Sequence, residues 1–182
     1  MAGTAEVLKQ LPKRAGVIYP CLTPNEKALD LYHSTGSDQH CDEIAIFLAA
    51  SEGFNKANLN RTVAQSLDIC EAVAKKAKSS GVRFRGYVST VIGCPFDGST
   101  ETRQVTSLAK ALLDMGCYEV SLGDTIGVGV PRTWEELLND VTRHIPIDKL
   151  GAHCHDTYGS GVANVLRAVE MGVATVDSSI GG

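Results

Sequence analysis

Residues 118–155 read YEVSLGDTIGVGVPRTWEELLNDVTRHIPIDKLGAHCH and contain two short apolar runs, 118–122 and 150–153, on either side of a helical pattern. Between the runs, apolar residues recur at helical spacing after a proline that suits a first helical turn: Pro131, then Trp134, Leu137, Leu138 and Val141. Consecutive strands that are joined through a helix run parallel. This stretch therefore predicts an α/β fold.

The same alternation extends over the rest of the 182 residues. We expect further strands at 17–22, 44–48, 84–91 and 174–177, and further helices at 5–13, 63–74, 105–113 and 162–169. Gly81, Gly116 and Gly172 follow three of these helices. Glycine readily adopts the left-handed backbone that ends a helix, so these positions are predicted to take it.

Two α/β architectures fit this pattern. A doubly wound sheet usually carries a glycine-rich phosphate loop after a strand, but residues 123–129 match neither GxGxxG nor a Walker loop. In a (β/α)₈ barrel the chemistry lies on the loops that follow the strands, and polar residues follow nearly every predicted strand here. We therefore predict an incomplete (β/α)₈ TIM barrel. About six of its eight βα units would be present, in a single domain over residues 1–182.

Composition excludes some classes of partner. The chain has 17 Lys and Arg against 21 Asp and Glu, and no basic stripe, which argues against nucleic acid or an anionic membrane as its partner. No apolar run approaches the roughly 18 residues that span a bilayer. The six cysteines show no CxxC spacing and follow no secretory leader, so we expect reduced thiols in an intracellular compartment.

The clearest local signal for chemistry is His153-Cys154-His155 at the end of an apolar run. Residues i and i+2 of a strand share a face, so both imidazoles should point the same way while Cys154 points to the other side. Two such imidazoles can bind one divalent cation, and Mg²⁺, Mn²⁺, Fe²⁺ or Zn²⁺ would suit them once oxygen ligands are added. The alternative is that both side chains make ordinary hydrogen bonds at a strand end.

Other polar side chains are placed to face the same pocket. Ser121, Asp124 and Thr125 follow or end a strand, where they could orient a substrate or cap the next helix. Arg85 and Tyr87 share one face of another strand, and an arginine that points into a barrel must meet an anion or a carboxylate. We interpret Cys94 as a small, partly buried residue, with a reactive thiol as the alternative.

These residues carry a resemblance to a known family. The motifs are YPCLTPN (19–25), RGYVS (85–89), IGCP (92–95), MGCYE (115–119), SLGDTIGVG (121–129), HCHDTYG (153–159) and VDSS (176–179). HCHDTYG alone would indicate only the wider superfamily of metallolyases and Claisen-condensing synthases. The combination resembles the 3-hydroxy-3-methylglutaryl-CoA lyase family over nearly the whole chain.

The resemblance implies a reaction and a site. The reaction is the cleavage of 3-hydroxy-3-methylglutaryl-CoA, an acyl-CoA, to acetyl-CoA and acetoacetate, as in leucine catabolism and ketone-body formation. A divalent cation, Mg²⁺ or Mn²⁺, would lie on His153 and His155, and His153 would help to remove the proton of the substrate hydroxyl. The polar end of the substrate pocket would be shaped by Arg85, Tyr87, Ser121, Asp124 and Thr125.

The resemblance also places family residues outside this sequence. An Arg-Asp pair and a catalytic Glu would precede Met1, and a loop with a catalytic Cys and a metal-binding Asn would follow Gly182. We therefore expect a chain that is truncated at both ends and inactive on its own. The family implies the mitochondrial matrix, but the first residues show no transit peptide, so the cytoplasm is the alternative.

Other functions stay open at this point. One is another metal-dependent barrel enzyme, a Claisen-type synthase or a hydrolase, although His33, His40 and His144 are not at later strand ends where a hydrolase needs them. The other is a non-catalytic form that associates with a full-length subunit. A homodimer is also expected as one form of assembly.

Overall fold

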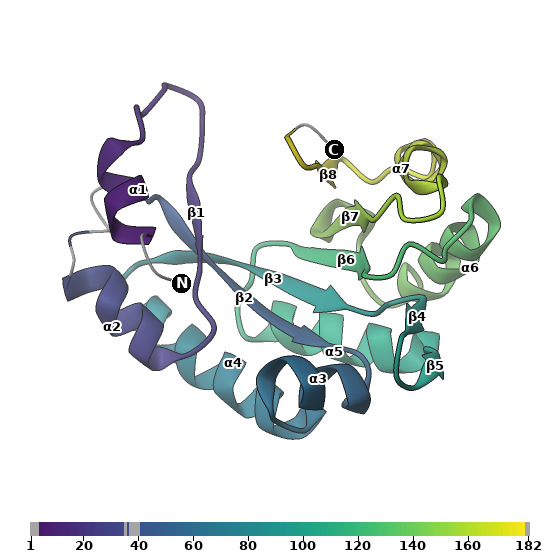
Figure 1. Cartoon of the computed structure of the whole chain (residues 1–182), viewed down its shortest axis with the longest axis horizontal. Coiled ribbons are helices and arrows are strands. Elements are labelled where there is room, and N and C mark those ends of the chain that lie inside the picture. The colour runs from purple at the N-terminus through teal and green to yellow at the C-terminus, as the bar shows by residue number, and fades with distance from the viewer. Residues whose placement is uncertain (1–3, 35, 37–40, 181–182) are drawn as a thin grey trace.

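One parallel sheet organises the molecule in the computed structural model, which describes residues 4–34, 36 and 41–180. Its strand order follows the sequence: β1 (Pro20–Leu22), β2 (Glu43–Ala49), β3 (Arg83–Ser89), β6 (Val120–Asp124), β7 (Leu150–Cys154) and β8 (Thr175–Asp177) (Figure 1). A doubly wound sheet would reverse direction at a switch point. Within the described part of the chain the order never reverses, which confirms six strands of an incomplete (β/α)₈ barrel.

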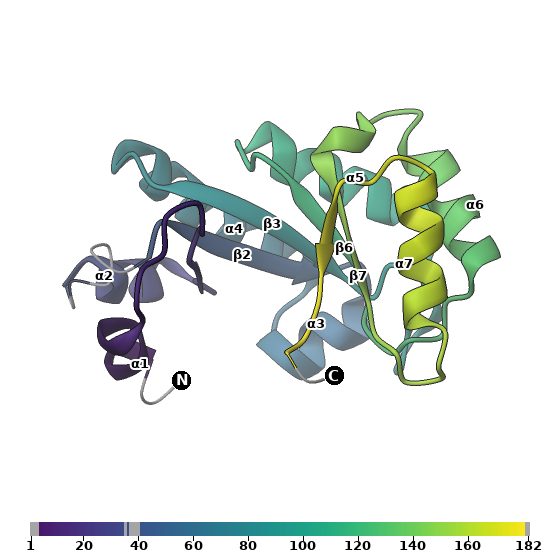
Figure 2. The same cartoon turned by 90° about the horizontal axis from the view of Figure 1, so that it is seen from above.

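The helices are α1 (Thr4–Gln10), α2 (Glu26–Ser34), α3 (Glu52–Leu59), α4 (Val63–Ser79), α5 (Thr102–Asp114), α6 (Pro131–Val141) and α7 (Gly161–Glu170). A 3₁₀ turn, Ile147–Lys149, leads into β7. Helices α4 to α7 lie on the outer side of the curved sheet, and β7 and β8 curl over its other side (Figures 1 and 2). The inner side is therefore the concave face of the sheet.

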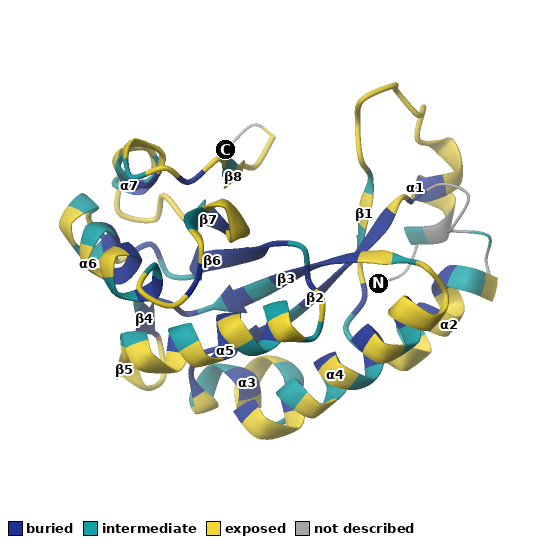
Figure 3. Cartoon of the chain, turned by 180° about the vertical axis from the view of Figure 1, so that it is seen from behind, coloured by how far each residue is buried: buried dark blue, intermediate teal, exposed yellow. Residues whose placement is uncertain are grey.

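Alternation along the strands separates the two faces of this sheet. The outer face is apolar and packs on the helices, through residues such as Ile44, Ile46, Leu48, Val88, Leu122 and Leu150. The concave face carries two rows of paired residues. Tyr87 pairs with Ser121 in one row. In the other row, His153 pairs with Gly123 on one side and with Asp177 on the other. Strands β2, β3 and β6 are mostly buried in Figure 3, whereas the helices are banded, as expected when each helix buries a single stripe. Burying each large aliphatic side chain contributes about 1.5–3 kcal/mol.

Several expectations on local structure are confirmed. The predicted strands are found with shifts of a few residues at their ends, and Gly81, Gly116 and Gly172 take φ of 68°, 104° and 108°. The six cysteines are all free in the structure. No helix among the described residues is long and apolar enough to cross a membrane.

Other expectations need correction. The helix predicted for 5–13 ends at Gln10, because the residue before Pro12 is pushed out of helical conformation. The strand predicted for 17–22 forms only over Pro20–Leu22, and Val17 and Ile18 remain exposed. A small hairpin of β4 (Gly93–Cys94) and β5 (Gly98–Ser99) was not expected at all. Its turn sequence, Pro95-Phe96-Asp97-Gly98, is a recognisable turn signal.

The carboxyl end of β2 is fixed by one buried amide. Asn55, on α3, is fully buried, and its Nδ2 donates to the carbonyl oxygens of Ala49 and Ser51 at 2.7 Å each. Its Oδ1 accepts from the N–H of Ala49 at 3.2 Å. The side chain thus satisfies backbone groups where the strand stops, as buried polar groups require.

We expect Asn55→Ala to lower the free energy of unfolding by about 2–4 kcal/mol, because it removes three hydrogen bonds and leaves buried backbone groups unpaired. Urea unfolding followed by circular dichroism measures this change. Asn58→Ala, at an exposed position of the same helix, is the matched control and should change stability by less than about 0.5 kcal/mol. Equal losses in the two variants would contradict this account.

Candidate functional site

Two imidazoles meet at the carboxyl end of β7. The Nε2 atoms of His153 and His155 are 3.2 Å apart, and the ring centroids are separated by 5.1 Å at an interplanar angle of 43°. Cys154, between them in sequence, packs against the hydrophobic core, and burial raises the pKa of its thiol to about 12. The i, i+2 spacing therefore brings the two rings together as predicted.

The separation of the two nitrogens fits one shared cation. Ligand atoms lie about 2.0–2.1 Å from Zn²⁺ or Mg²⁺, so two nitrogens on one such ion are roughly 2.9–3.4 Å apart. Among the residues that the structure describes, no group of three or more His, Cys, Asp or Glu side chains is arranged to hold a metal. His153 and His155 could supply two nitrogen ligands, and a cation on them would need its other ligands from water, substrate or other residues.

Below the His pair lies an arginine whose charge is withdrawn from water. The Arg85 side chain is only 8% exposed. Its Nε donates to Glu119 Oε1 at 2.7 Å, and its Nη1 donates to Asp177 Oδ1 at 2.6 Å. Thr175 donates to the other oxygen of Glu119 at 2.6 Å. The expectation that an inward-facing arginine must meet carboxylates is confirmed.

Asp177 joins this arginine to the His pair. Its Oδ2 accepts from the Ser121 hydroxyl at 2.6 Å and lies 3.2 Å from His153 Nδ1. Burial would raise the pKa of this carboxyl, but the hydrogen bonds from His153, Ser121 and Arg85, with the charge of Arg85, lower it from 3.8 to about 2. Asp177 is therefore ionised. Two carboxylates against one guanidinium leave a net negative charge beside the imidazoles, which favours a cation there.

Tyr87 closes one side of the network. Its hydroxyl oxygen accepts from Arg85 Nη1 at 2.7 Å, and the guanidinium carbon lies 4.9 Å from the centre of its ring. Burial and the nearby Asp177 raise the pKa of Tyr87 more than Arg85 lowers it. The phenol therefore keeps its proton, which is available to donate to an acceptor on the concave face.

Asp124 and Thr125 bond to backbone in the neighbouring loops. Asp124 is fully buried, and its Oδ2 accepts from the N–H of Gly129 at 2.8 Å. The hydroxyl of Thr125 accepts from the N–H of Thr90 at 2.8 Å. Thr90 has φ of 59°, a strained conformation for a β-branched residue, so its neighbours have to hold it in place. The sequence left open that this pair orients a substrate or caps the next helix, but these contacts are with the backbone of neighbouring loops, and the N-cap of α6 is Val130.

Two functional candidates escaped the sequence analysis. Glu119 and Asp177 were not singled out, although an inward Arg85 required a carboxylate partner. Asp177 ends a predicted strand at the same edge as His153, which is the signal that could have found it.

Cys94 is buried, and its Sγ accepts from the N–H groups of Phe96 and Asp97 at 3.4 Å each.

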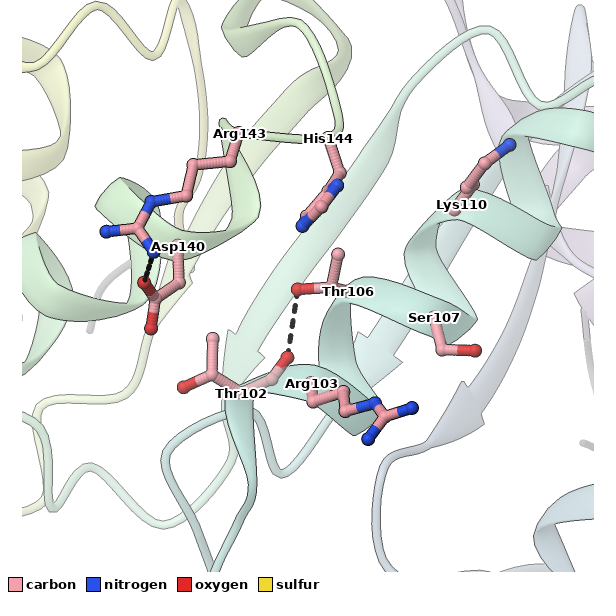
Figure 4. A pocket seen from close by; sticks show the side chains of 8 residues that line it. All are labelled: Thr102, Arg103, Thr106, Ser107, Lys110, Asp140, Arg143 and His144. Carbon is pink, nitrogen blue, oxygen red and sulfur yellow. Dashed lines mark hydrogen bonds and ion pairs between the residues drawn. The ribbon is translucent and has the colours of Figure 1, made fainter.

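Two other histidines that the structure describes, His33 and His144, are not part of the His pair. His33 is on α2, His144 is exposed after α6, and His40 lies outside the described residues. His144 lines a groove of roughly 400 Å³ in the outer helical layer, together with Thr102, Arg103, Thr106, Ser107, Lys110, Asp140 and Arg143 (Figure 4). Its cations do not converge, since Arg143 is paired with Asp140 at 3.2 Å and Lys110 with Asp114 at 2.8 Å.

Comparison with known proteins gives a family. The model of the HMGL-like family matches residues 2–182. Over all 182 residues, the chain is 47% identical to a mitochondrial hydroxymethylglutaryl-CoA lyase of Bos taurus, of which it covers 55%. It is 44% identical to a cytoplasmic 3-hydroxy-3-methylglutaryl-CoA lyase of Danio rerio, of which it covers 53%. The chain thus spans about half the length of these relatives.

A solved structure gives the fold of such a relative. The HMG-CoA lyase of Brucella melitensis superposes with a TM-score of 0.94 at 41% identity, over 100% of this chain and 63% of that one. The six-stranded sheet therefore corresponds to part of the barrel of an HMG-CoA lyase.

The low pKa of Asp177 predicts an acid-sensitive fold. Because the folded pKa lies below the unfolded value of 3.8, the stabilisation is complete above about pH 4 and is lost as the pH falls towards 2. It amounts to roughly 2 kcal/mol. Urea unfolding of the metal-free chain between pH 5 and pH 2.5 should show this loss in the parent and a flatter profile in Asp177→Asn. Parallel profiles would contradict the assignment.

Proposed function

Because the chain belongs to the HMGL-like family, we propose that it supplies the metal-binding and part of the substrate-binding face of a hydroxymethylglutaryl-CoA lyase. The reaction is the cleavage of 3-hydroxy-3-methylglutaryl-CoA to acetyl-CoA and acetoacetate, a step of leucine breakdown and ketone-body formation. The cofactor is Mg²⁺ or Mn²⁺. Similarity to lyases over the whole chain favours this reaction over the synthase and hydrolase alternatives.

The observation that carries this proposal is the convergence of His153 and His155. Their Nε2 atoms are 3.2 Å apart at the carboxyl end of a barrel strand, which is where catalytic residues of such barrels are found. An excess of negative charge lies directly beneath them, from Asp177 and Glu119 against Arg85. A divalent cation matches both the nitrogen donors and the charge.

The chemistry can be divided between the residues on the concave face. A bound divalent cation supplies Lewis-acid polarisation of the substrate's hydroxyl and carbonyl oxygens. His153 and His155 would hold it through their Nε2 atoms, and His153 would help to remove the proton of the 3-hydroxyl by taking it on Nε2 when that nitrogen is not on the cation. As the C2–C3 bond breaks, the former hydroxyl oxygen becomes the ketone of acetoacetate. The electron pair passes to the acetyl thioester as an enolate, which an acid then protonates.

The other predicted site residues divide into two groups. Tyr87 has a free phenolic proton and is proposed to donate to a substrate oxygen. Arg85 and Ser121 direct their donors at Asp177, so we assign them a role through that carboxylate. Asp124 and Thr125 shape the loops that border the pocket.

The mitochondrial matrix is the proposed compartment, since the relative from Bos taurus is named as mitochondrial. The relative from Danio rerio is named as cytoplasmic, which makes the cytoplasm the alternative. Imaging of the tagged chain in its own cells separates the two.

Metal affinity tests the role of the two imidazoles. His155→Ala should weaken Mn²⁺ binding at least tenfold, because it removes one of the two nitrogen ligands. Paramagnetic resonance of free Mn²⁺ during a titration measures the affinity. His144→Ala, which removes an exposed histidine of the outer groove, is the matched control and should bind like the parent. Equal affinity in the parent and in His155→Ala would refute the metal assignment.

The proposed activity can be tested in a chimera. These 182 residues should support catalysis when they replace the matching segment of the full-length Bos taurus relative. Acetoacetate release from the acyl-CoA should then require Mg²⁺ or Mn²⁺ and fall at least about 100-fold in His155→Ala, but not in His144→Ala.

The 182-residue chain assayed by itself should be at least tenfold slower than this chimera. Size-exclusion chromatography of this chain alone shows whether it self-associates, and a pull-down against the full-length relative shows whether it joins a full-length subunit. A chimera that folds and binds metal but releases no acetoacetate would contradict the proposed reaction.

A further inference from the structure

The carboxylate of Asp177 has both oxygens engaged. Oδ1 accepts from Arg85 at 2.6 Å, and Oδ2 accepts from Ser121 at 2.6 Å while lying 3.2 Å from His153 Nδ1. Donors on β3 and β6 thus hold it from two sides, so it cannot turn away from the imidazole. The strand pairing also keeps the carboxylate next to the imidazole, because His153 and Asp177 are direct partners in the pairing of β7 with β8.

An ionised carboxylate only accepts hydrogen bonds, so the nitrogen that faces it has to be the donor. Both oxygens of Asp177 accept hydrogen bonds, Oδ1 from the Arg85 guanidinium and Oδ2 from the Ser121 hydroxyl, so this side chain is an ionised carboxylate. The proton of a neutral His153 ring therefore belongs on Nδ1. Its Nε2 is left with a lone pair, which both a metal ligand and a proton acceptor need.

The contact between the two imidazoles is consistent with this proton arrangement. Two nitrogen lone pairs would repel at 3.2 Å, so in the metal-free chain one of the two Nε2 atoms has to carry a proton. His153 carries its proton on Nδ1, which makes His155 the donor through Nε2–H. His155 is exposed and free to exchange between tautomers.

We infer that Asp177 is a positioning residue that fixes the proton of His153 on Nδ1 and aims its Nε2 at the cation site. This inference rests on the proposed function only for the identity of what Nε2 meets. The two histidines then respond differently to a bound cation. His153 keeps one tautomer with or without metal, while His155 moves its proton from Nε2 to Nδ1 when a cation binds.

Glu119 provides a matched control for this inference. It is about as buried as Asp177, with side-chain exposures of 10% and 18%, and it also pairs with Arg85. Its other oxygen accepts from Thr175, and its hydrogen bonds do not involve His153. A purely structural role of the ion network would affect both carboxylate variants. A positioning role would change the tautomer of His153 only in the Asp177 variant.

The experiment is long-range ¹H–¹⁵N spectroscopy of the ¹⁵N-histidine-labelled chain, at a pH where the imidazoles are neutral. In the metal-free parent, His153 should be protonated on Nδ1 and His155 on Nε2. Saturating Zn²⁺ should change the tautomer of His155 alone. In Asp177→Asn, His153 should show mixed tautomers and Zn²⁺ affinity by calorimetry should fall 10–100-fold. Glu119→Gln removes one negative charge but no contact to His153, so it should keep the parent tautomer and lose less affinity than Asp177→Asn.

The inference is overturned if His153 carries its proton on Nε2 in the parent, a result that needs no variant. It is also overturned if Asp177→Asn keeps the parent tautomer, or if Glu119→Gln loses it equally. Should Asp177→Asn fail to fold, Ser121→Ala removes one of the contacts that hold the carboxylate and should partly mix the tautomers. A parent with the expected tautomers that binds no Zn²⁺ or Mn²⁺ would contradict the proposed function and leave the positioning role intact.

Discussion

The charge of Arg85 lies on the concave face of the sheet, out of reach of bulk water, and the carboxylates around it determine much of the remaining geometry. A buried guanidinium is tolerated only with hydrogen-bonded counter-charges. Here they come from Glu119, just before β6, and from Asp177 on β8. The ion network thus ties three strands together across 92 residues of sequence. Because Asp177 is held in this way, it can in turn hold His153.

This arrangement links stability to function. Arg85 and Ser121 lower the free energy of the ionised Asp177, which lets a carboxylate stay charged beside the imidazole. The carboxylate then sets which nitrogen of His153 is exposed towards the cation. The remaining negative charge adds to the affinity of the site for that cation. Arg85 and Ser121 thereby act through Asp177 on the protonation of the His153 nitrogens at the carboxyl end of β7.

Sequence reasoning recovered the parts of this design that depend on local patterns. The strands, the parallel order and the His153-Cys154-His155 geometry follow from residue periodicity and from i, i+2 spacing. The need of Arg85 for a carboxylate followed from the cost of a buried charge. Its partners were not identified: the position of Asp177 at a strand end marked it as a candidate, but its pairing with Arg85 depends on how β3 and β8 approach each other after folding. The β4–β5 hairpin was missed because its two strands are only two residues long and show no alternation of apolar and polar residues.

The central claim is that His153 and His155 hold one divalent cation between them. Anomalous scattering from crystals of the chain grown with Mn²⁺ tests it most directly. The account predicts a single manganese peak about 2.1–2.3 Å from both Nε2 atoms, with His153 Nδ1 still within hydrogen-bond distance of Asp177. Manganese held by one imidazole alone, or no peak between two rings that remain 3.2 Å apart at saturating Mn²⁺, would contradict it.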